Sequence, residues 1–373
     1  LKEKIDELSK SEKEELTSWL QASPKNKKIY ARLQEKSFSE DIARYQQIST
    51  TRGLDNYRRR YVQTNKRLLG KWYWAAAVAV FIIGIATLFF YQEEHPTVAK
   101  TTISPGSSKA MLILNNGEII SLSEKNKTEI VATEELSIRN EGSRLRYTAS
   151  ENTKNEQANN YNELIVPKGG EFTLTLSDGT KVWLNSETKM EYPLCFGQDT
   201  REVKLTGEAY FEVKKDAKRP FNVLMGDARI EVTGTSFNAS CYPEKGDCSA
   251  TLTSGKINLW GDHSMKRVNV GEHAVYDKTS KEITVKEVDL KYYTSWRHGT
   301  FYFYDTPLSE ITEALGRWYD VKFYFSDESL RDVCFSGAAL RNRPIDFILK
   351  LLENTQSLKF SIQKDGTIWI SKK

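Results

Sequence analysis

The sequence has few of the residues on which catalysis and metal binding depend. Four histidines (His95, His263, His273 and His298) are scattered over 373 residues, and none has a serine, cysteine or carboxylate at the spacing of a triad or metal site. We expect them at the surface or at strand ends. No Walker, Rossmann or kinase glycine pattern occurs. The sequence therefore predicts no catalytic residue, no cofactor and no metal.

Acidic residues are common, but they do not form an evident catalytic pair. Glu202, Glu208 and Glu212 alternate along one segment, as residues on a solvated strand face do. A glycosidase needs two carboxyl groups about 5 to 9.5 Å apart across a cleft. No such pair stands out, so a glycan-active enzyme has no specific support.

One long uncharged segment dominates the first quarter of the chain. Residues 72–91 (WYWAAAVAVFIIGIATLFFY) contain no charged side chain, and aromatic residues lie at both ends. At about 1.5 Å per helical residue, this segment spans about 30 Å, the thickness of the hydrocarbon core of a bilayer. The sequence predicts one transmembrane helix, in preference to a cleaved signal peptide or a buried core helix.

The charge differs on the two sides of this segment. Residues 1–71 carry 17 Lys+Arg and 10 Asp+Glu, net +7, and the remaining residues carry 37 and 40, net −3. The positive-inside rule places the N-terminus in the cytoplasm and the C-terminus on the other side of the membrane. Topology and anionic lipid explain the basic excess, so we expect no direct contact with nucleic acid.

Residues 1–60 show short polar helical patterns, which predict a small helical bundle. Leu16, Trp19 and Leu20 recur at helical spacing. A bundle this small buries little apolar surface by itself, so these three residues are candidates for contact with a partner. Packing inside the bundle is the alternative. Because the chain begins with Leu1 rather than Met, we expect leading residues before it.

After a polar linker (residues 93–109), residues 110–290 alternate as β-strands. Two segments repeat: MLILNNGEIISL (residues 111–122) and TLTLSDGTKVWL (residues 173–184). Each reads as a hairpin with an Asn-Gly or Asp-Gly two-residue turn. The sequence predicts an all-β domain, either an antiparallel sandwich or a solenoid.

The pattern changes in residues 296–372. Thr306 and Pro307 are expected to start a helix that buries Leu308, Ile311, Leu315 and Trp318, and Pro344 a second helix that buries Ile345, Ile348, Leu349 and Leu352. Short apolar segments lie between and after them. The expected order is β-α-β-β-α-β-β, a small α+β module.

All four cysteines (Cys195, Cys241, Cys248 and Cys334) follow the apolar segment, on the side where disulfides are permitted. Only Cys241 and Cys248 are near neighbours, around the turn CYPEKGDC, and they can close one bridge. Two free, buried thiols are the alternative.

One peptide bond has the residues needed for self-cleavage. In Gly234–Thr235 a threonine hydroxyl follows an unhindered glycine carbonyl, as an N-to-O acyl shift requires. A simple Gly-Thr turn in a strand is the alternative.

Several segments closely resemble the FecR family of inner-membrane anti-sigma factors and sigma regulators. They are IVPKGGEFTLTLSDGTKVWLNSETKMEYP (165–193), REVKLTGEAYFEVKKDAKRPFNV (201–223) and IEVTGTSFNASCY (230–242). Residues 295–325 and 335–353 resemble the C-terminal module of Bacteroidetes members, which is similar to the short N-terminal domain of secretins and TonB-dependent receptors. Residues 17–33 resemble the anti-sigma segment more loosely.

The resemblance implies a signal relay. An outer-membrane TonB-dependent transducer would contact the C-terminal module through its signalling domain, and this contact would change the hold of the cytoplasmic segment on an extracytoplasmic-function sigma factor. Several family members are described as self-cleaving at a Gly-Thr bond, and Gly234–Thr235 matches that position, with Thr233 where relatives often have Leu. A membrane-anchored envelope-binding protein, a glycan-active enzyme and a secretin-like assembly subunit are the alternatives.

Overall fold

The computed structural model describes residues 17, 21, 27, 103–132, 136–149 and 160–373. The chain divides into two compact units, Leu1–His95 and Pro96–Lys373, and all described residues except the first three belong to the second. The expected transmembrane helix (72–91) lies outside the described residues, as does the cytoplasmic segment (1–60) apart from those three. None of the described helices has the length and apolar character needed to cross a bilayer.

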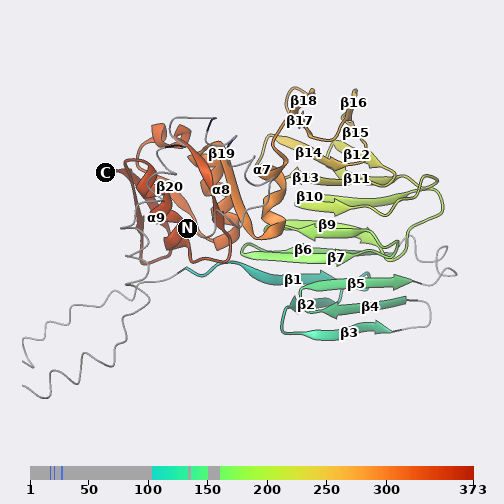
Figure 1. The fold of residues 1–373 in the computed structure, drawn as a ribbon. Coiled ribbons are helices and arrows are strands. Elements are labelled where there is room, and N and C mark those ends of the chain that lie inside the picture. The colour runs from blue at the N-terminus through green and yellow to red at the C-terminus, as the bar shows by residue number, and fades with distance from the viewer. Residues whose placement is uncertain (1–16, 18–20, 22–26, 28–102, 133–135, 150–159) are drawn as a thin grey trace, which may run out of the picture. The chain divides into compact units, whose positions relative to one another are not determined.

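Eighteen strands form the first part of this unit, the β region, which confirms the prediction of a β-rich fold (Figure 1). They are β1 (Ser107–Ile113), β2 (Ile119–Ser123), β3 (Lys127–Ala132), β4 (Leu136–Glu141), β5 (Arg144–Ala149), β6 (Tyr161–Val166), β7 (Gly170–Thr175), β8 (Lys181–Leu184), β9 (Thr188–Pro193), β10 (Arg201–Glu212), β11 (Phe221–Met225), β12 (Ala228–Val232), β13 (Ser236–Cys241), β14 (Asp247–Ser254), β15 (Ile257–Trp260), β16 (Met265–Val268), β17 (Glu272–Asp277) and β18 (Ile283–Glu287). Strand β1 begins inside the segment expected to be linker.

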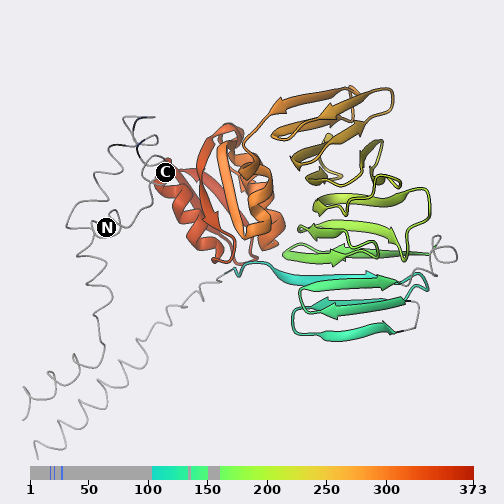
Figure 2. The ribbon, with the colours of Figure 1, turned by 45° about the vertical axis from the view of Figure 1, so that its right-hand side comes forward.

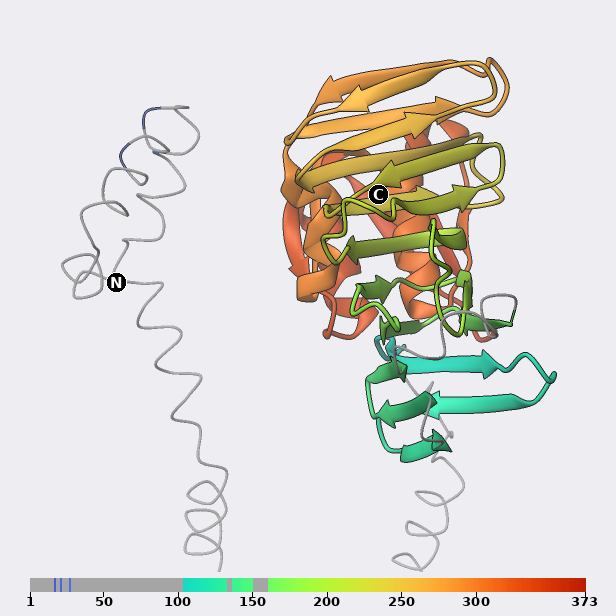
Figure 3. The ribbon, with the colours of Figure 1, turned by 90° about the vertical axis from the view of Figure 1, so that its right-hand side faces the viewer.

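The strands pair into two sheets that share β10, and the first residues of β1 also pair with β7 of the second sheet. The first sheet has the order β2-β1-β6-β9-β10-β11-β12-β15-β16. The second has the order β3-β4-β5-β7-β8-β10-β13-β14-β17-β18. Figure 3 shows the strands following one another as rungs along the β region. One hydrophobic core contains buried side chains of both sheets, such as Leu112 and Val223 of the first and Phe237 of the second. The β region is therefore a two-layer sandwich.

Gly207 is the point where β10 passes from one sheet to the other. Residues before it pair with β9 and β11, and residues from Gly207 onward pair with β8 and β13. Its φ is +105°, and a Cβ atom here would lie 2.7 Å from the Cα atom of Thr188. Only glycine fits this position without displacing backbone.

The two repeated segments form hairpins with the same turn, but the turn is not the two-residue loop that was predicted. Gly117 donates to the carbonyl of Leu114 (2.8 Å) and Gly179 to that of Leu176 (2.9 Å). Only the glycine of each turn has positive φ, +85° and +88°. A type I′ turn would need positive φ at two residues. Both loops are therefore three residues long, a type I turn followed by a left-handed glycine.

Residues 300–372 form the C-terminal module, whose element order is the one expected (Figure 2). Its elements are β19 (Thr300–Pro307), α8 (Leu308–Tyr319), β20 (Phe323–Phe325), the short turn η3 (Glu328–Asp332), β21 (Cys334–Leu340), α9 (Ile345–Thr355), β22 (Leu358–Ile362) and β23 (Ile368–Lys372). Strands β19 and β21 pair as one sheet, and β20, β23 and β22 as another. All eight apolar residues predicted to be buried by the two helices are buried.

The start of α8 differs from the prediction in one detail. The N-cap is Pro307 rather than Thr306, and no side chain caps the helix. Thr306 belongs to β19, where its hydroxyl oxygen accepts a hydrogen bond from the backbone N–H of Tyr304 (3.0 Å). The hydroxyl is therefore engaged with the strand and does not cap the helix.

Candidate functional site

The β region and the C-terminal module meet at a junction that contains a buried arginine. Arg341 follows β21 of the module and is only 2% exposed. Its guanidinium carbon lies 3.8 Å from the ring centroid of Trp318 on α8. Burial lowers the pKa of Arg341, and the carboxylates of Glu171 and Glu208 in the β region act in the opposite direction. An arginine remains charged under these conditions, so the junction contains a buried positive charge.

Five residues at the junction form a closed ring of hydrogen bonds. Arg341 donates to the side-chain oxygen of Asn185 (2.9 Å) and to the carbonyl of Trp296 (2.9 Å). The indole N–H of Trp296 donates to Asn238 (3.1 Å). Asn185 and Asn238 then donate to the two carboxylate oxygens of Glu208, at 2.7 and 2.9 Å. The ring joins strands of the β region, the connecting segment and the module, and we call it the junction ring.

The connecting segment is short and is held to the β region beside the ring. It contains α7 (Leu290–Thr294) and the short turn η2 (Ser295–His298). Arg297 forms an ion pair with Glu212 (2.8 Å) and lies 3.9 Å from the ring centroid of Tyr210 on β10. The side chain of Arg297 is mostly buried, so this contact adds cation–π attraction to the ion pair.

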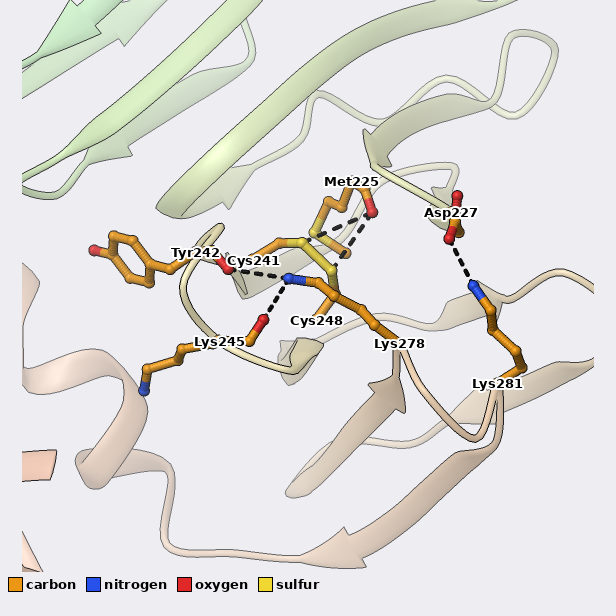
Figure 4. Close-up of a disulfide and its surroundings, with 8 residues drawn as sticks. All are labelled: Met225, Asp227, Cys241, Tyr242, Lys245, Cys248, Lys278 and Lys281. Atoms are coloured by element: carbon orange, nitrogen blue, oxygen red, sulfur yellow. Dashed lines mark hydrogen bonds and ion pairs between the residues drawn. A yellow bond between two sulfur atoms is a disulfide. The ribbon is translucent and has the colours of Figure 1, made fainter. Parts of the chain in front are cut away.

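A disulfide closes the loop between β13 and β14 (Figure 4). The sulfur atoms of Cys241 and Cys248 are 1.97 Å apart, so the structure contains the bridge rather than two thiols. The ammonium group of Lys278 donates to the carbonyls of Tyr242 (3.0 Å) and Lys245 (2.6 Å) inside this loop. The disulfide therefore joins the two ends of the loop, and Lys278 holds the residues between them to the β region.

The same loop contacts α8 of the module. The guanidinium carbon of Arg317 lies 4.2 Å from the ring centroid of Tyr242, and its Nη1 atom is 3.4 Å from a carboxylate oxygen of Glu244. Lys245 pairs with Glu313 (3.6 Å). The exposed ion pairs add little energy by themselves, but together they align the loop with α8.

A cleft of about 660 Å³ lies between the β region and the module. Aromatic side chains of both parts line it, among them Tyr242, Tyr292, Tyr293, Trp296, Tyr302 and Tyr304. Its volume lies within the range of about 300 to 1,000 Å³ that is common for ligand-binding clefts. The described residues contain no group of His, Cys, Asp and Glu side chains suited to hold a metal ion.

One prediction about polar residues was wrong. Glu208 and Glu212 do not lie on a solvated strand face: both are partly buried and bonded within the junction, whereas Glu202 has no such contact there. His273 lies at the beginning of β17, as expected of a strand-end histidine, but it is buried, with its Nδ1 atom 2.8 Å from the Thr251 hydroxyl. The error for Glu208 and Glu212 arises because their partners come from segments far away in the sequence. Of the other three histidines, His263 and His298 are exposed and His95 lies outside the described residues.

The Gly234–Thr235 bond lies in the β region, before β13. A Cβ atom at Gly234 would lie 2.8 Å from the Cα atom of Lys215. The Thr235 side chain is buried, and its hydroxyl donates to the carbonyl of Lys256 (3.0 Å). The backbone of residues 213–216 is hydrogen-bonded to both sides of the bond, through Val213 and Asp216. Close packing thus requires glycine at position 234.

The remaining site predictions concern Leu16, Trp19 and Leu20, which lie outside the described residues. Sequence reasoning missed Arg341, Asn185 and Asn238 altogether. Trp296 and Arg341 lie within segments that resemble the C-terminal module of the FecR family. That resemblance is the signal in the sequence that could have pointed to them.

The fold and the junction define a two-part protein, in which a β-sandwich is joined to a small α+β module through buried polar contacts. Comparisons with known proteins agree. The model of the FecR protein family matches residues 162–258, and that of the FecR C-terminal family matches residues 300–370. No curated protein matches the chain.

Two solved structures of a candidate anti-sigma factor from Parabacteroides distasonis ATCC 8503, at 1.65 and 2.50 Å resolution, are similar to this chain. Each is 30% identical in sequence, aligns with a TM-score of 0.53, and covers 57% of this chain and 99% of its own. The chain belongs to the FecR family of anti-sigma factors. Anti-sigma factors are regulators and in general are not enzymes.

Proposed function

We propose that this chain is a single-pass inner-membrane regulator that relays a signal from an outer-membrane TonB-dependent transducer to an extracytoplasmic-function sigma factor. Residues 1–60 bind the sigma factor in the cytoplasm, and residues 72–91 cross the membrane. The β region and the C-terminal module lie in the periplasm, where the module contacts the signalling domain of the transducer. A bridge between Cys241 and Cys248 suits that oxidising compartment.

The junction ring is the observation that carries the proposal. A relay requires that a partner bound to the module changes the β region, which leads back to the membrane segment. Arg341 of the module reaches Asn185 of the β region, 156 positions away in the sequence. Because buried hydrogen bonds of a charged group are costly to leave unmade, a displaced module would disturb the β region directly.

Co-purification tests the sigma-factor role. The full chain in detergent is expected to retain an extracytoplasmic-function sigma factor of its host, and Trp19→Ala is expected to weaken the complex about tenfold or more, as loss of a buried aromatic anchor does. Trp369→Ala is the matched control, because Trp369 is exposed on the module. If no sigma factor of the host is retained, or if both variants behave alike, the proposal fails.

We also propose self-cleavage at Gly234–Thr235. In an N-to-O shift the Thr235 hydroxyl attacks the Gly234 carbonyl, the amide nitrogen leaves as an amine, and water then hydrolyses the ester. The close contact of Gly234 with Lys215 supports a constrained bond. Freshly made protein should give two fragments on a denaturing gel, and Thr235→Ala one full-length band. A single band from both proteins would contradict cleavage.

A further inference from the structure

The cleft between the β region and the module has walls from both parts of the molecule. Asp247 and His273 belong to strands β14 and β17 of the β region. Glu310 belongs to α8 of the module, and Tyr292 and Tyr293 belong to α7 between them. A side chain that enters the cleft therefore touches both parts at once.

Tyrosines form an aromatic corner in this cleft. The rings of Tyr292 and Tyr293 meet at right angles, with centroids 4.7 Å apart. His273 stacks on Tyr293 at 4.1 Å and holds that ring in place. All three residues line the cleft, and both tyrosines are partly exposed. Ring faces of this kind attract cations.

Carboxylates surround the aromatic corner. Glu310 accepts a hydrogen bond from the hydroxyl of Tyr292 (2.8 Å), and Asp289 accepts one from the hydroxyl of Tyr302 (3.3 Å). Burial raises the pKa of Tyr293 to about 12, and the negative charges of Glu310 and Asp247 add to the effect. Glu310 of the module, Asp247 of the β region and Tyr293 all line the same cleft.

Cations of the chain do not balance these carboxylates. Within the described part of the chain, none of Asp247, Asp289 and Glu310 forms an ion pair, whereas Lys245 and Arg317 of the cleft pair with Glu313 and Glu244. Lys286 also lines the cleft and lies opposite His273 in the pairing of β17 with β18, and Arg341 is engaged in the junction ring. Six Asp and Glu residues line the cleft against four Lys and Arg residues, so its lining is net negative. The acidic groups do not form a metal site either. The aromatic rings beside these carboxylates favour the cationic side chain of lysine or arginine as a ligand, because ring faces attract such groups.

We propose that this tyrosine cleft binds a lysine or arginine side chain of a partner protein. Its cation lies between Asp247 and Glu310 and against the rings of Tyr292 and Tyr293, where charge attraction and cation–π contact act together. Because the two carboxylates belong to different walls, the cation fastens the module to the β region. The inference goes beyond the proposed relay, since a binding measurement tests it whether or not the chain acts on a sigma factor.

The test measures binding of fluorescein-labelled hexa-arginine to the full chain in detergent by fluorescence anisotropy. The double variant Asp247→Asn, Glu310→Gln is expected to bind about tenfold more weakly than the wild type. The control variant Glu118→Gln, Glu282→Gln removes the same charge from exposed residues outside the cleft and should bind as the wild type does. Glu310→Lys should bind hexa-arginine more weakly still and gain affinity for labelled hexa-glutamate.

Thermal unfolding of each variant establishes that it folds. Equal weakening in the cleft and control variants would show that only total charge matters and would overturn the proposal. Failure of the wild-type chain to bind hexa-arginine would overturn it too. Should the double variant not fold, Glu310→Lys decides alone, because Glu310 is exposed on α8 and its replacement leaves the core intact.

Discussion

The β region and the C-terminal module differ in what they leave exposed to solvent. Eleven large hydrophobic side chains of the described residues are exposed, and six of them belong to the much shorter module. They are Tyr304, Tyr324, Leu340, Phe347, Leu351 and Trp369. Contiguous exposed apolar patches mark sites of interaction. We propose a different task for each part: the β region provides a stable frame, and the module provides contact surface.

The difference extends to how the strands are paired. The strands of the β region pair along two continuous sheets around one core, whereas the module divides its strands between a two-stranded and a three-stranded sheet. Small sheets leave a larger share of their strand edges open to pairing with another chain. This arrangement again favours the module as the part that meets a partner.

The largest expected effect is the loss of a core side chain in the β region. Phe237 is fully buried and stacks on Phe211 at 5.1 Å. Phe237→Ala should lower the free energy of unfolding by about 3 to 5 kcal/mol. Trp369→Ala, on the exposed face of the module, should cost less than about 1 kcal/mol. Urea unfolding measures the free energy of unfolding of both variants. A similar decrease in the two variants would contradict the distinction between a stable frame and a contact surface.

The next effect concerns the junction between the two parts. Arg341→Ala leaves the acceptors of Asn185 and Trp296 without their buried donor and should cost about 2 to 4 kcal/mol. The wild-type chain is expected to lose the β region and the module in one transition, and the variant in two. Arg331→Ala, which removes an exposed ion pair with Glu328, should keep a single transition. Two transitions in the wild type would show that the parts are independent.

The smallest effect depends on pH. Burial, together with the charge of Lys286, lowers the pKa of His273 to about 4. In the unfolded chain the pKa is about 6.5, so between these values only the unfolded state takes up the proton. The free energy of unfolding should therefore fall as pH decreases from about 6.5 to about 4, by up to about 3 kcal/mol. His273→Gln should flatten this part of the curve, and the exposed His263→Gln should not. Identical curves for both variants would contradict the role of burial.

Local sequence patterns predicted much of this structure. The helical spacing of Leu308, Ile311 and Leu315 identified the buried face of α8, and alternating residues identified most strands. These features depend on neighbours along the chain, whose side-chain period is set by the backbone. The repeated hairpins were predicted for the same reason. Their turn type was predicted wrongly, because it depends on whether φ is also positive at the residue before the glycine.

The junction could not be predicted in this way. Arg341, Asn185 and Trp296 meet only because the sandwich places β8 beside β10 and the connecting segment returns across them. No spacing in the sequence records such contacts. Glu208 shows the consequence, because its position on an alternating strand suggested solvent, whereas two asparagines from other segments satisfy its carboxylate.

Sigma-dependent transcription in the host tests the central claim, that a signal passes from the module to the β region through the junction ring. A strain with the wild-type chain should change this transcription when the outer-membrane transducer is deleted, and a strain with Arg341→Ala at equal membrane abundance should not. Arg331→Ala serves as the control and should respond as the wild type does. A full response from Arg341→Ala would contradict the account.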